Sequence, residues 1–154
     1  TTLDDGEGWL VEPKQLDQAG QLWRPGVKVG IKPGSWSHRN EWFGPVLGVM
    51  RAPDLQTGIK WQNAVQYGLT AGIHALDVEE LEHWIDQIEA GNIYVNRNMI
   101  GAVVGVQPFG GEGLSGTGPK AGGPHYLYRF CAEQTVTVNT AAAGGNAELL
   151  AQMA

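Results

Sequence analysis

Two stretches of the chain carry residues whose types and spacing could bind a ligand. The longer stretch is 107–124, where seven of 18 residues are glycine and three are proline. Glycine leaves backbone N–H groups uncovered and reaches backbone conformations closed to other residues, while proline limits the movement of the loop. Aromatic residues stand at the head of the loop and just past its end: Phe109, Tyr126, Tyr128 and Phe130. We predict a fixed loop that presents backbone donors to a small anion.

The second stretch is Glu41-Trp-Phe-Gly-Pro-Val46. The carboxylate of Glu41 could accept two hydrogen bonds from a vicinal diol. Phe43, restrained by the Gly44-Pro45 pair that follows it, could offer its ring face to a flat heterocycle. A surface glutamate beside a core phenylalanine is an equally good interpretation, and the residues alone leave both open.

A dinucleotide-binding pattern, Gly-x-Gly-x-x-Gly, occurs at Gly111, Gly113 and Gly116. In a true site of this kind the last glycine opens a helix whose N-terminus faces the pyrophosphate. Here the residues that follow, 117–124, contain three glycines and two prolines and are incompatible with a helix. We therefore predict no nucleotide-phosphate site in this loop.

The remaining reactive side chains do not form a recognisable site. The histidines at 38, 74, 83 and 125 have no metal-ligand spacing, and one cysteine cannot complete a zinc site. Cys131 lies between Phe130 and Ala132, which favours a packed, unreactive thiol. We assign no catalytic residue and no metal ligand to this chain.

The composition excludes several classes of protein. The chain has 154 residues, a net charge of −6 and scattered Lys and Arg, which argues against binding of nucleic acid or of an anionic membrane surface. No apolar run approaches the roughly 20 residues of a membrane-spanning helix. The single cysteine favours a reducing, intracellular setting. The N-terminus is acidic, lacks signal-peptide features and has no initiator Met, so we expect the chain to be a piece of something longer.

The residue pattern in the first half of the chain predicts strands and one helix. Val27–Ile31 alternates as a half-buried strand does, and Val46–Met50 is a continuous apolar run suited to a buried strand. Asp54 can cap a helix over 55–67, and Thr70–Leu76 follows as a short strand. Core or lid packing is expected for the tryptophans at 9, 23 and 36.

The clearest helix begins after Asp77. Asp77 and Glu80 have capping-box spacing, an apolar stripe follows, and Gly91 stands where a C-terminal cap belongs. Strands are expected at 93–96, 102–106 and 134–139, and a short helix or ordered turn at 126–130. A short terminal helix at 147–153 closes the chain. The alternation of strand and helix indicates an α/β fold with parallel pairing.

Four motifs together resemble the aldehyde dehydrogenase superfamily. They are Glu41-Trp-Phe-Gly-Pro-Val, Tyr67-Gly-Leu-Thr, Gly91-Asn-Ile-Tyr-Val-Asn and Pro108-Phe-Gly-Gly with Ser115-Gly, and they stand in the family's order. Further stretches resemble the glutamate-semialdehyde (1-pyrroline-5-carboxylate) dehydrogenase branch, above all its module in bacterial bifunctional proline utilization A proteins: 94–98, 101–111, 118–124 and 135–146.

The resemblance implies a partial catalytic domain over 1–132, with a mostly parallel sheet flanked by helices, and a C-terminal strand and tail of the oligomerisation-flap type over 133–154. It implies NAD as cofactor, with Glu41 on the nicotinamide ribose hydroxyls and Phe43 against the nicotinamide. The substrate, glutamate γ-semialdehyde, would have its carboxylate held by backbone amides of Gly122 and Gly123. Phe109 would line the aldehyde pocket, Phe130 would pack on the aliphatic stem of the substrate, and Ser115 would have only a structural role.

The departures from the family pattern matter equally. The neighbourhood of the family's nucleophilic cysteine is absent, Cys131 lies where the family has no nucleophile, and the dinucleotide-binding domain is missing. The resemblance thus implies the C-terminal third of a module, inactive alone, whose partners are the missing NAD-binding and nucleophile-bearing parts of its parent. The parent is expected to be cytoplasmic, able to associate peripherally with a membrane, and homo-oligomeric, with FAD only in an upstream proline dehydrogenase domain.

Two alternatives remain at this point. One is a non-catalytic interaction module that pairs with another chain through the strand at 135–140. The other is an aldehyde dehydrogenase of a different substrate range.

Overall fold

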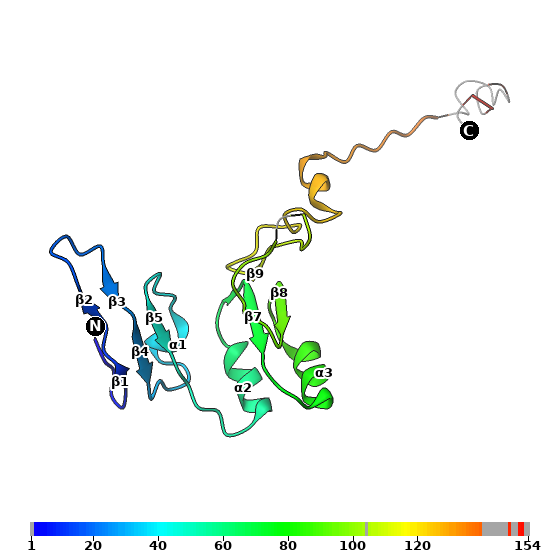
Figure 1. Ribbon diagram of the computed structural model, residues 1–154. Helices are drawn as coiled ribbons and strands as arrows, with labels where there is room; N and C mark the ends of the chain where they lie inside the picture. The colour runs from blue at the N-terminus through cyan, green and yellow to red at the C-terminus, as the bar shows by residue number, and fades with distance from the viewer. Residues whose placement is uncertain (1, 104, 140–147, 149–150, 153–154) are drawn as a thin grey trace.

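The computed structural model describes residues 2–103, 105–139, 148 and 151–152. Figure 1 shows two groups of elements in succession along the chain, followed by a short helix and an extended segment that leads toward the C-terminus. The first group contains β1 to β5 and α1, and the second contains β6 to β9, α2 and α3. The fold is therefore a mixed α/β arrangement in which each group carries one of the two predicted ligand-binding stretches.

The first group is built on a three-stranded sheet in the order β1-β4-β5. β4 (Gly26–Val29) lies between β1 (Gly8–Val11), to which it is antiparallel, and β5 (Val46–Gly48), to which it is parallel. A two-residue antiparallel ladder of β2 (Lys14–Gln15) and β3 (Trp23–Arg24) extends from it. The short helix α1 (Trp36–Arg39) is capped by Ser35, whose Oγ accepts from the N–H of His38.

The strands of this sheet differ from prediction in the side that they bury. In β4 the buried residues are Gly26 and Lys28, while Val27 and Val29 are only half-buried. Burial therefore alternates along the strand as predicted, but the lysine and not the valines faces the interior. β5 is a strand, as expected, but it is not buried, since Leu47 is 61% exposed. The tryptophans also depart from core packing, with Trp36 61% exposed.

The second group contains the hydrophobic core. β7 (Thr70–Ile73) and β8 (Asn92–Val95) pair in parallel and are connected through α3 (Val78–Gln87). Helices α2 (Leu55–Gln62) and α3 pack against this pair, and the buried cluster is Ile59, Ala71, Trp84 and Ile88. This β-α-β unit is the part of the fold that the sequence predicts best.

Both helices begin where the sequence predicts. Asp54 Oδ1 accepts from the N–H of Thr57 at 2.7 Å, and Asp77 Oδ1 accepts from the N–H groups of Glu79 and Glu80 at 2.8 and 3.4 Å. Their ends were predicted less well. α2 ends at Gln62 rather than 67, because the side chain of Asn63 bonds the backbone of 87 and 89 across to the end of α3.

Glycines near these helix ends have other roles than predicted. Gly68, which follows directly on the helix predicted over 55–67, belongs to β6 (Tyr67–Gly68), and β6 pairs with β9 (Glu112–Gly113). α3 is capped at Ile88, not at Gly91. Gly91 is required because a Cβ there would lie 2.0 Å from the carbonyl oxygen of Gly110. Both glycines therefore allow a close approach of the loop that follows β8.

Other predictions are wrong or fall outside the described residues. The described part of 102–106 is loop and turn rather than strand, and 134–139 forms no strand within the described chain. The ladders are mixed, two parallel and three antiparallel among the described residues, rather than mostly parallel. Cys131 is exposed rather than packed. Most of 147–153 lies outside the described residues.

One histidine links the two groups. His38 Nδ1 accepts from the N–H of Gly34 at 2.9 Å, so its Nε2 carries the proton and donates to the carbonyl of Trp61, also at 2.9 Å. This bond joins α1 to the end of α2. The helix beside the Glu41 stretch is thereby tied to the unit that carries the glycine loop.

Candidate functional site

The glycine loop is closed at its base by backbone pairing. Phe109 and Ala121 exchange two hydrogen bonds, N–H to carbonyl at 3.0 and 2.9 Å, as an isolated antiparallel bridge. The ammonium of Lys120 donates to the carbonyl of Gly110 at 2.7 Å and reinforces this closure. The structure therefore places Phe109 directly opposite the approach to Gly122 and Gly123, three residues that the sequence predicts to share a site.

A side chain from β8 fixes the other side of this loop. Asn92 Nδ2 donates to the carbonyl of Pro108, and Asn92 Oδ1 accepts from the N–H of Gly110, both at 3.0 Å. The two bonds flank Phe109 and hold its backbone against the parallel strand pair. Sequence reasoning missed Asn92, because nothing in the local pattern shows that the chain returns to it.

Gly122 and Gly123 have different local environments. Gly122 has φ +71°, a conformation that favours glycine, and a Cβ there would meet nothing within 4 Å. At Gly123 a Cβ would lie 3.0 Å from the Lys120 carbonyl oxygen and 3.3 Å from Pro108 Cβ. The N–H of Gly123 donates to the Lys120 carbonyl at 3.0 Å. Gly122 thus borders open space, whereas Gly123 makes a tight turn.

Beyond the loop, η1 (Tyr126–Phe130) is the short helical turn that the sequence predicts. Phe130 is 71% exposed and meets Tyr126 edge to face, with ring centroids 5.6 Å apart. The guanidinium of Arg129 donates to the carbonyl of Thr117, which ties the turn back to the loop. The residues between Gly116 and η1 form no helix, as predicted.

Ser115 bonds within the fold. Its hydroxyl accepts from the N–H of Gly68 at 3.4 Å, beside the β6–β9 ladder. A Cβ on Gly111 would lie 2.7 Å from Ser115 Cβ. These contacts hold the outer part of the loop against β6, and they fit the structural role expected of Ser115.

Glu41 and Phe43 lie on the segment that connects α1 to β5. Glu41 and Trp42 line two hollows, of about 620 Å³ and about 420 Å³, and Phe43 lines the smaller one. Glu41 is exposed and the ring of Phe43 is 93% exposed, so the alternative of a core phenylalanine is wrong. Phe43 also has φ 41°, a conformation that costs a bulky residue about 1–3 kcal/mol.

The structure brings the predicted residues together only in part. Phe109, Gly122 and Gly123 form one unit near η1 and Phe130, whereas Glu41 and Phe43 lie on the first group of elements (Figure 1). Within the described ranges no three His, Cys, Asp or Glu residues gather as a metal site. No helix in the same ranges is long and apolar enough to cross a membrane.

Residues 3–136 match the profile of the aldehyde dehydrogenase family. The chain therefore belongs to that family, and the four motifs that resemble the superfamily lie within the matched region.

Individual relatives agree with the narrower resemblance. The bifunctional protein PutA of Rhizobium meliloti is 59% identical over 94 residues, which are 60% of this chain and 8% of that protein. The structure of proline utilization A from Corynebacterium freiburgense matches with a TM-score of 0.82 and 45% identity, over 94% of this chain and 16% of that one. The structure of Thermus 1-pyrroline-5-carboxylate dehydrogenase with bound NAD matches with a TM-score of 0.72 and 41% identity, over 76% and 23%.

This chain spans between 7% and 24% of the lengths of the curated relatives it matches. The matched PutA and 1-pyrroline-5-carboxylate dehydrogenase chains are thus several times longer than the sequence described here.

Proposed function

We propose that this chain is part of an NAD-dependent dehydrogenase that oxidises L-glutamate γ-semialdehyde, the open form of 1-pyrroline-5-carboxylate, to L-glutamate in proline catabolism. The glycine loop carries this proposal. Its closed base sets Phe109 across from Gly122 and Gly123, and its sequence lies within the region shared with the relatives. Within the proposal, the chain supplies binding surfaces and another part of the parent supplies the nucleophile.

The loop suits an amino-acid carboxylate for a physical reason. An anion held by backbone N–H groups needs glycines, because a side chain would keep it away from the amides. Gly122 is exposed and a Cβ there would meet nothing within 4 Å, which leaves room for a ligand beside this residue. A carboxylate would compete with the Lys120 carbonyl for the N–H of Gly123. Phe109 and Phe130 would then pack on the aliphatic part of the substrate.

NAD fits the second stretch by the chemistry of its side chains. Glu41 offers an exposed carboxylate suited to the two hydroxyls of a ribose, and the exposed ring of Phe43 beside it suits a flat nicotinamide. When bound, NAD accepts the hydride from the oxidised carbon. The residues of this chain would orient its nicotinamide half. The NAD-bound Thermus relative supports this choice of cofactor.

The rest of the proposal concerns the parent protein. Its missing NAD-binding and nucleophile-bearing parts are the partners of this chain, and FAD belongs to an upstream proline dehydrogenase domain. We place the parent in the cytoplasm. Residues 133–154 would form its oligomerisation flap, and the exposure of residues 133–138 favours this role. The same observation favours the rival interaction module.

Two glycines of the loop allow a matched test in the complete dehydrogenase. Gly122 and Gly118 both have positive φ, +71° and +94°, and a Cβ on either meets nothing within 4 Å. Alanine therefore causes backbone strain at both positions, and more at Gly118, whose φ lies further from the left-handed helical region. We expect Gly122→Ala to raise the KM for the semialdehyde at least tenfold and Gly118→Ala to change it less than threefold. Gly123→Val should also raise this KM strongly.

Steady-state kinetics at saturating NAD measure these effects. Equal changes in the semialdehyde KM for Gly122→Ala and Gly118→Ala would indicate that the loop does not bind the substrate carboxylate. Comparison with an aldehyde of equal length that lacks the α-carboxylate tests the substrate range. Wild-type enzyme should prefer the semialdehyde, and Gly122→Ala should lose most of that preference.

A further inference from the structure

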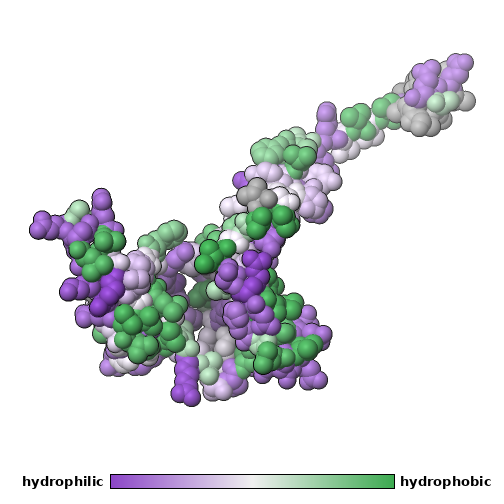
Figure 2. Space-filling model, viewed as in Figure 1, coloured by the Kyte–Doolittle hydropathy of each residue, from purple (hydrophilic) through white to green (hydrophobic). Residues whose placement is uncertain are grey.

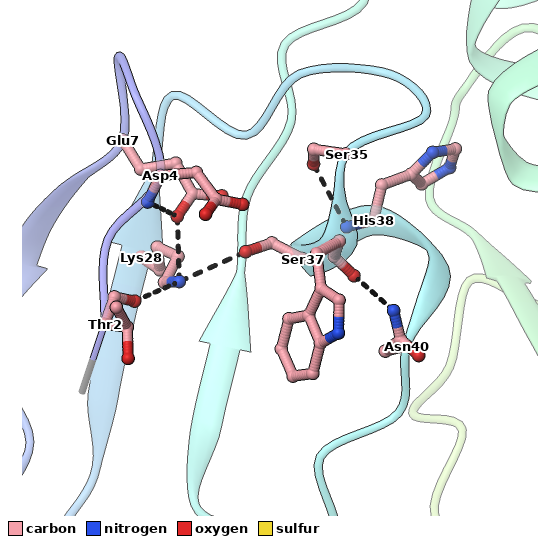
Figure 3. A network of polar contacts seen from close by, with 9 residues as sticks. Thr2, Asp4, Glu7, Lys28, Ser35, Ser37, His38 and Asn40 are labelled. Carbon is pink, nitrogen blue, oxygen red and sulfur yellow. Dashed lines mark hydrogen bonds and ion pairs between the residues drawn. The ribbon is translucent and has the colours of Figure 1, made fainter.

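A buried lysine with complete bonding lies behind the Glu41 stretch. Lys28 on β4 is 3% exposed, and its ammonium donates three hydrogen bonds: to the Thr2 carbonyl at 3.0 Å, to Glu7 Oε2 at 2.9 Å and to Ser37 Oγ at 3.1 Å. Figure 3 shows these three groups converging on the Lys28 nitrogen, two from the N-terminal segment and one from α1. All three ammonium protons are used, so Lys28 has no donor left for a ligand.

The same ammonium lies against two indole rings. Its nitrogen is 4.6 Å from the ring centroid of Trp42 and 5.4 Å from that of Trp9, within the range of cation–π attraction. Trp42 Nε1 is buried and has no hydrogen-bond partner in the described chain. Trp36 stacks on Trp42 with ring centroids 5.9 Å apart. The Trp42 ring is therefore fixed by its faces, one of them toward Lys28.

The position of Trp42 determines that of its neighbours, because it stands between Glu41 and Phe43. The backbone at Phe43 is strained, with φ 41°, and the Phe43 ring has almost no contacts of its own to hold it there. On the far side, the N–H of Gly26 donates to the Pro45 carbonyl at 2.8 Å, again from β4. A strained conformation persists only where its surroundings determine it.

We propose that Lys28 is a positioning residue that holds Glu41 and Phe43, through Trp42, in the arrangement that binds the cofactor. This inference rests on the proposed function, in which Glu41 and Phe43 contact NAD. Lys28 lines the larger hollow beside Glu41, but its three protons are already donated within the protein, so it would act through Trp42 and not on a ligand. It ties the N-terminal segment, β4, α1 and the Trp42 ring to one point, and so limits the movement of the segment between α1 and β5.

The alternative is that the ion pair of Lys28 and Glu7 only stabilises the fold and does not position the cofactor-binding residues. Removing one partner leaves an unpaired buried charge and destabilises the fold, whereas neutralising both is often tolerated. The informative variant is therefore the double substitution Lys28→Met/Glu7→Gln. A matched control exists in the exposed pair Lys32–Asp5, 3.1 Å apart, which joins the same two segments. Its double variant is Lys32→Met/Asp5→Asn.

The test measures the Kd of NAD by calorimetry and both substrate KM values in the complete dehydrogenase. We expect Lys28→Met/Glu7→Gln to weaken NAD binding at least tenfold, with the semialdehyde KM changed less than twofold. Lys32→Met/Asp5→Asn should change neither value more than twofold. Trp42→Leu keeps the ion pair but removes the indole ring, and it should weaken NAD binding as much as Lys28→Met/Glu7→Gln does. If Lys28→Met/Glu7→Gln does not fold, the NAD affinity of Trp42→Leu decides the outcome.

Glu41→Gln separates the two proposals. If Glu41→Gln weakens NAD binding but the folded Lys28→Met/Glu7→Gln variant and Trp42→Leu bind NAD within twofold of wild type, Lys28 has no positioning role and the inference is overturned. If Glu41→Gln itself has no effect on NAD binding, the proposed cofactor contact is wrong, and the inference fails with it.

Discussion

At the scale of single residues, the least expected feature of the chain is the buried ion pair of Glu7 and Lys28. The Glu7 side chain is 1% exposed, and burial acts to raise its pKa. Hydrogen bonds from Ser37, from the Asp4 N–H and from Lys28, with the charge of Lys28, outweigh burial and lower the pKa from 4.5 to about 2. The carboxylate is therefore more stable in the folded protein than in the unfolded chain.

The lowered pKa of Glu7 fixes the sign of a pH effect. The stability that the carboxylate contributes is fully present above pH 4.5 and is lost as the pH falls through that value toward about 2. We expect Glu7→Gln to lower the melting temperature of the complete protein at pH 6 and to have a smaller effect at pH 3. Differential scanning calorimetry at the two pH values measures this. An effect that grows at pH 3 would contradict the assignment.

Sequence reasoning could not have found this pair. Lys28 stands between Val27 and Val29, and such alternation predicts apolar residues inside and the lysine in solvent. The opposite orientation depends on Glu7, Trp9 and Trp42, which are distant in sequence. Glu41 and Phe43 could be proposed from the sequence because they belong to one contiguous motif.

At the scale of elements, local hydrogen bonding explains what could be predicted. Asp54 and Asp77 cap helices within their own turn, so residue type and spacing were enough to place both helix starts. The ladder of β6 with β9 and the closure of the loop by Asn92 join segments that are far apart in the chain. The residue pattern within one segment does not indicate such long-range contacts. The strand predicted at 102–106 was wrong because it rested on the pattern of that segment alone.

The cap of α3 gives a prediction at this scale. Asp77→Ala removes the acceptor for two N–H groups, and we expect a loss of about 1 kcal/mol in the free energy of unfolding of the complete protein. Asp86→Ala, on the exposed face of the same helix, should change it by less than about 0.5 kcal/mol. Urea denaturation measures both. Similar losses in the two variants would show that charge or helix propensity, rather than capping, is responsible.

At the scale of the whole molecule, the chain exposes more surface than a compact protein of its size. A compact 16.5 kDa protein exposes roughly 7,500 Å², whereas this chain exposes 11612 Å². Hydrophobic side chains gather on the visible face of the β1–β5 group (Figure 2), and Leu76, Val78 and Phe130 are all more than 60% exposed. The family fold was predictable from motifs, but the described residues include only six buried hydrophobic ones, and so small a core suits a piece of a larger domain.

The isolated chain should therefore behave unlike the complete enzyme. We expect it to self-associate, because exposed apolar faces that lack their partner domain bury one another. Size-exclusion chromatography with light scattering tests this, and a clean monomer at micromolar concentration would count against it. The same preparation should show no NAD-dependent aldehyde oxidation. Measurable turnover would contradict the proposal that the nucleophile lies elsewhere in the parent.

The central claim is that two separate stretches of this chain bind two different ligands of one dehydrogenase. Steady-state KM values for both ligands, measured in Glu41→Gln and Gly122→Ala forms of the complete enzyme, test it most directly. We predict that Glu41→Gln raises the KM for NAD at least tenfold with little change for the semialdehyde, and that Gly122→Ala does the reverse. The claim is contradicted if both variants shift the two KM values together, or if neither value moves.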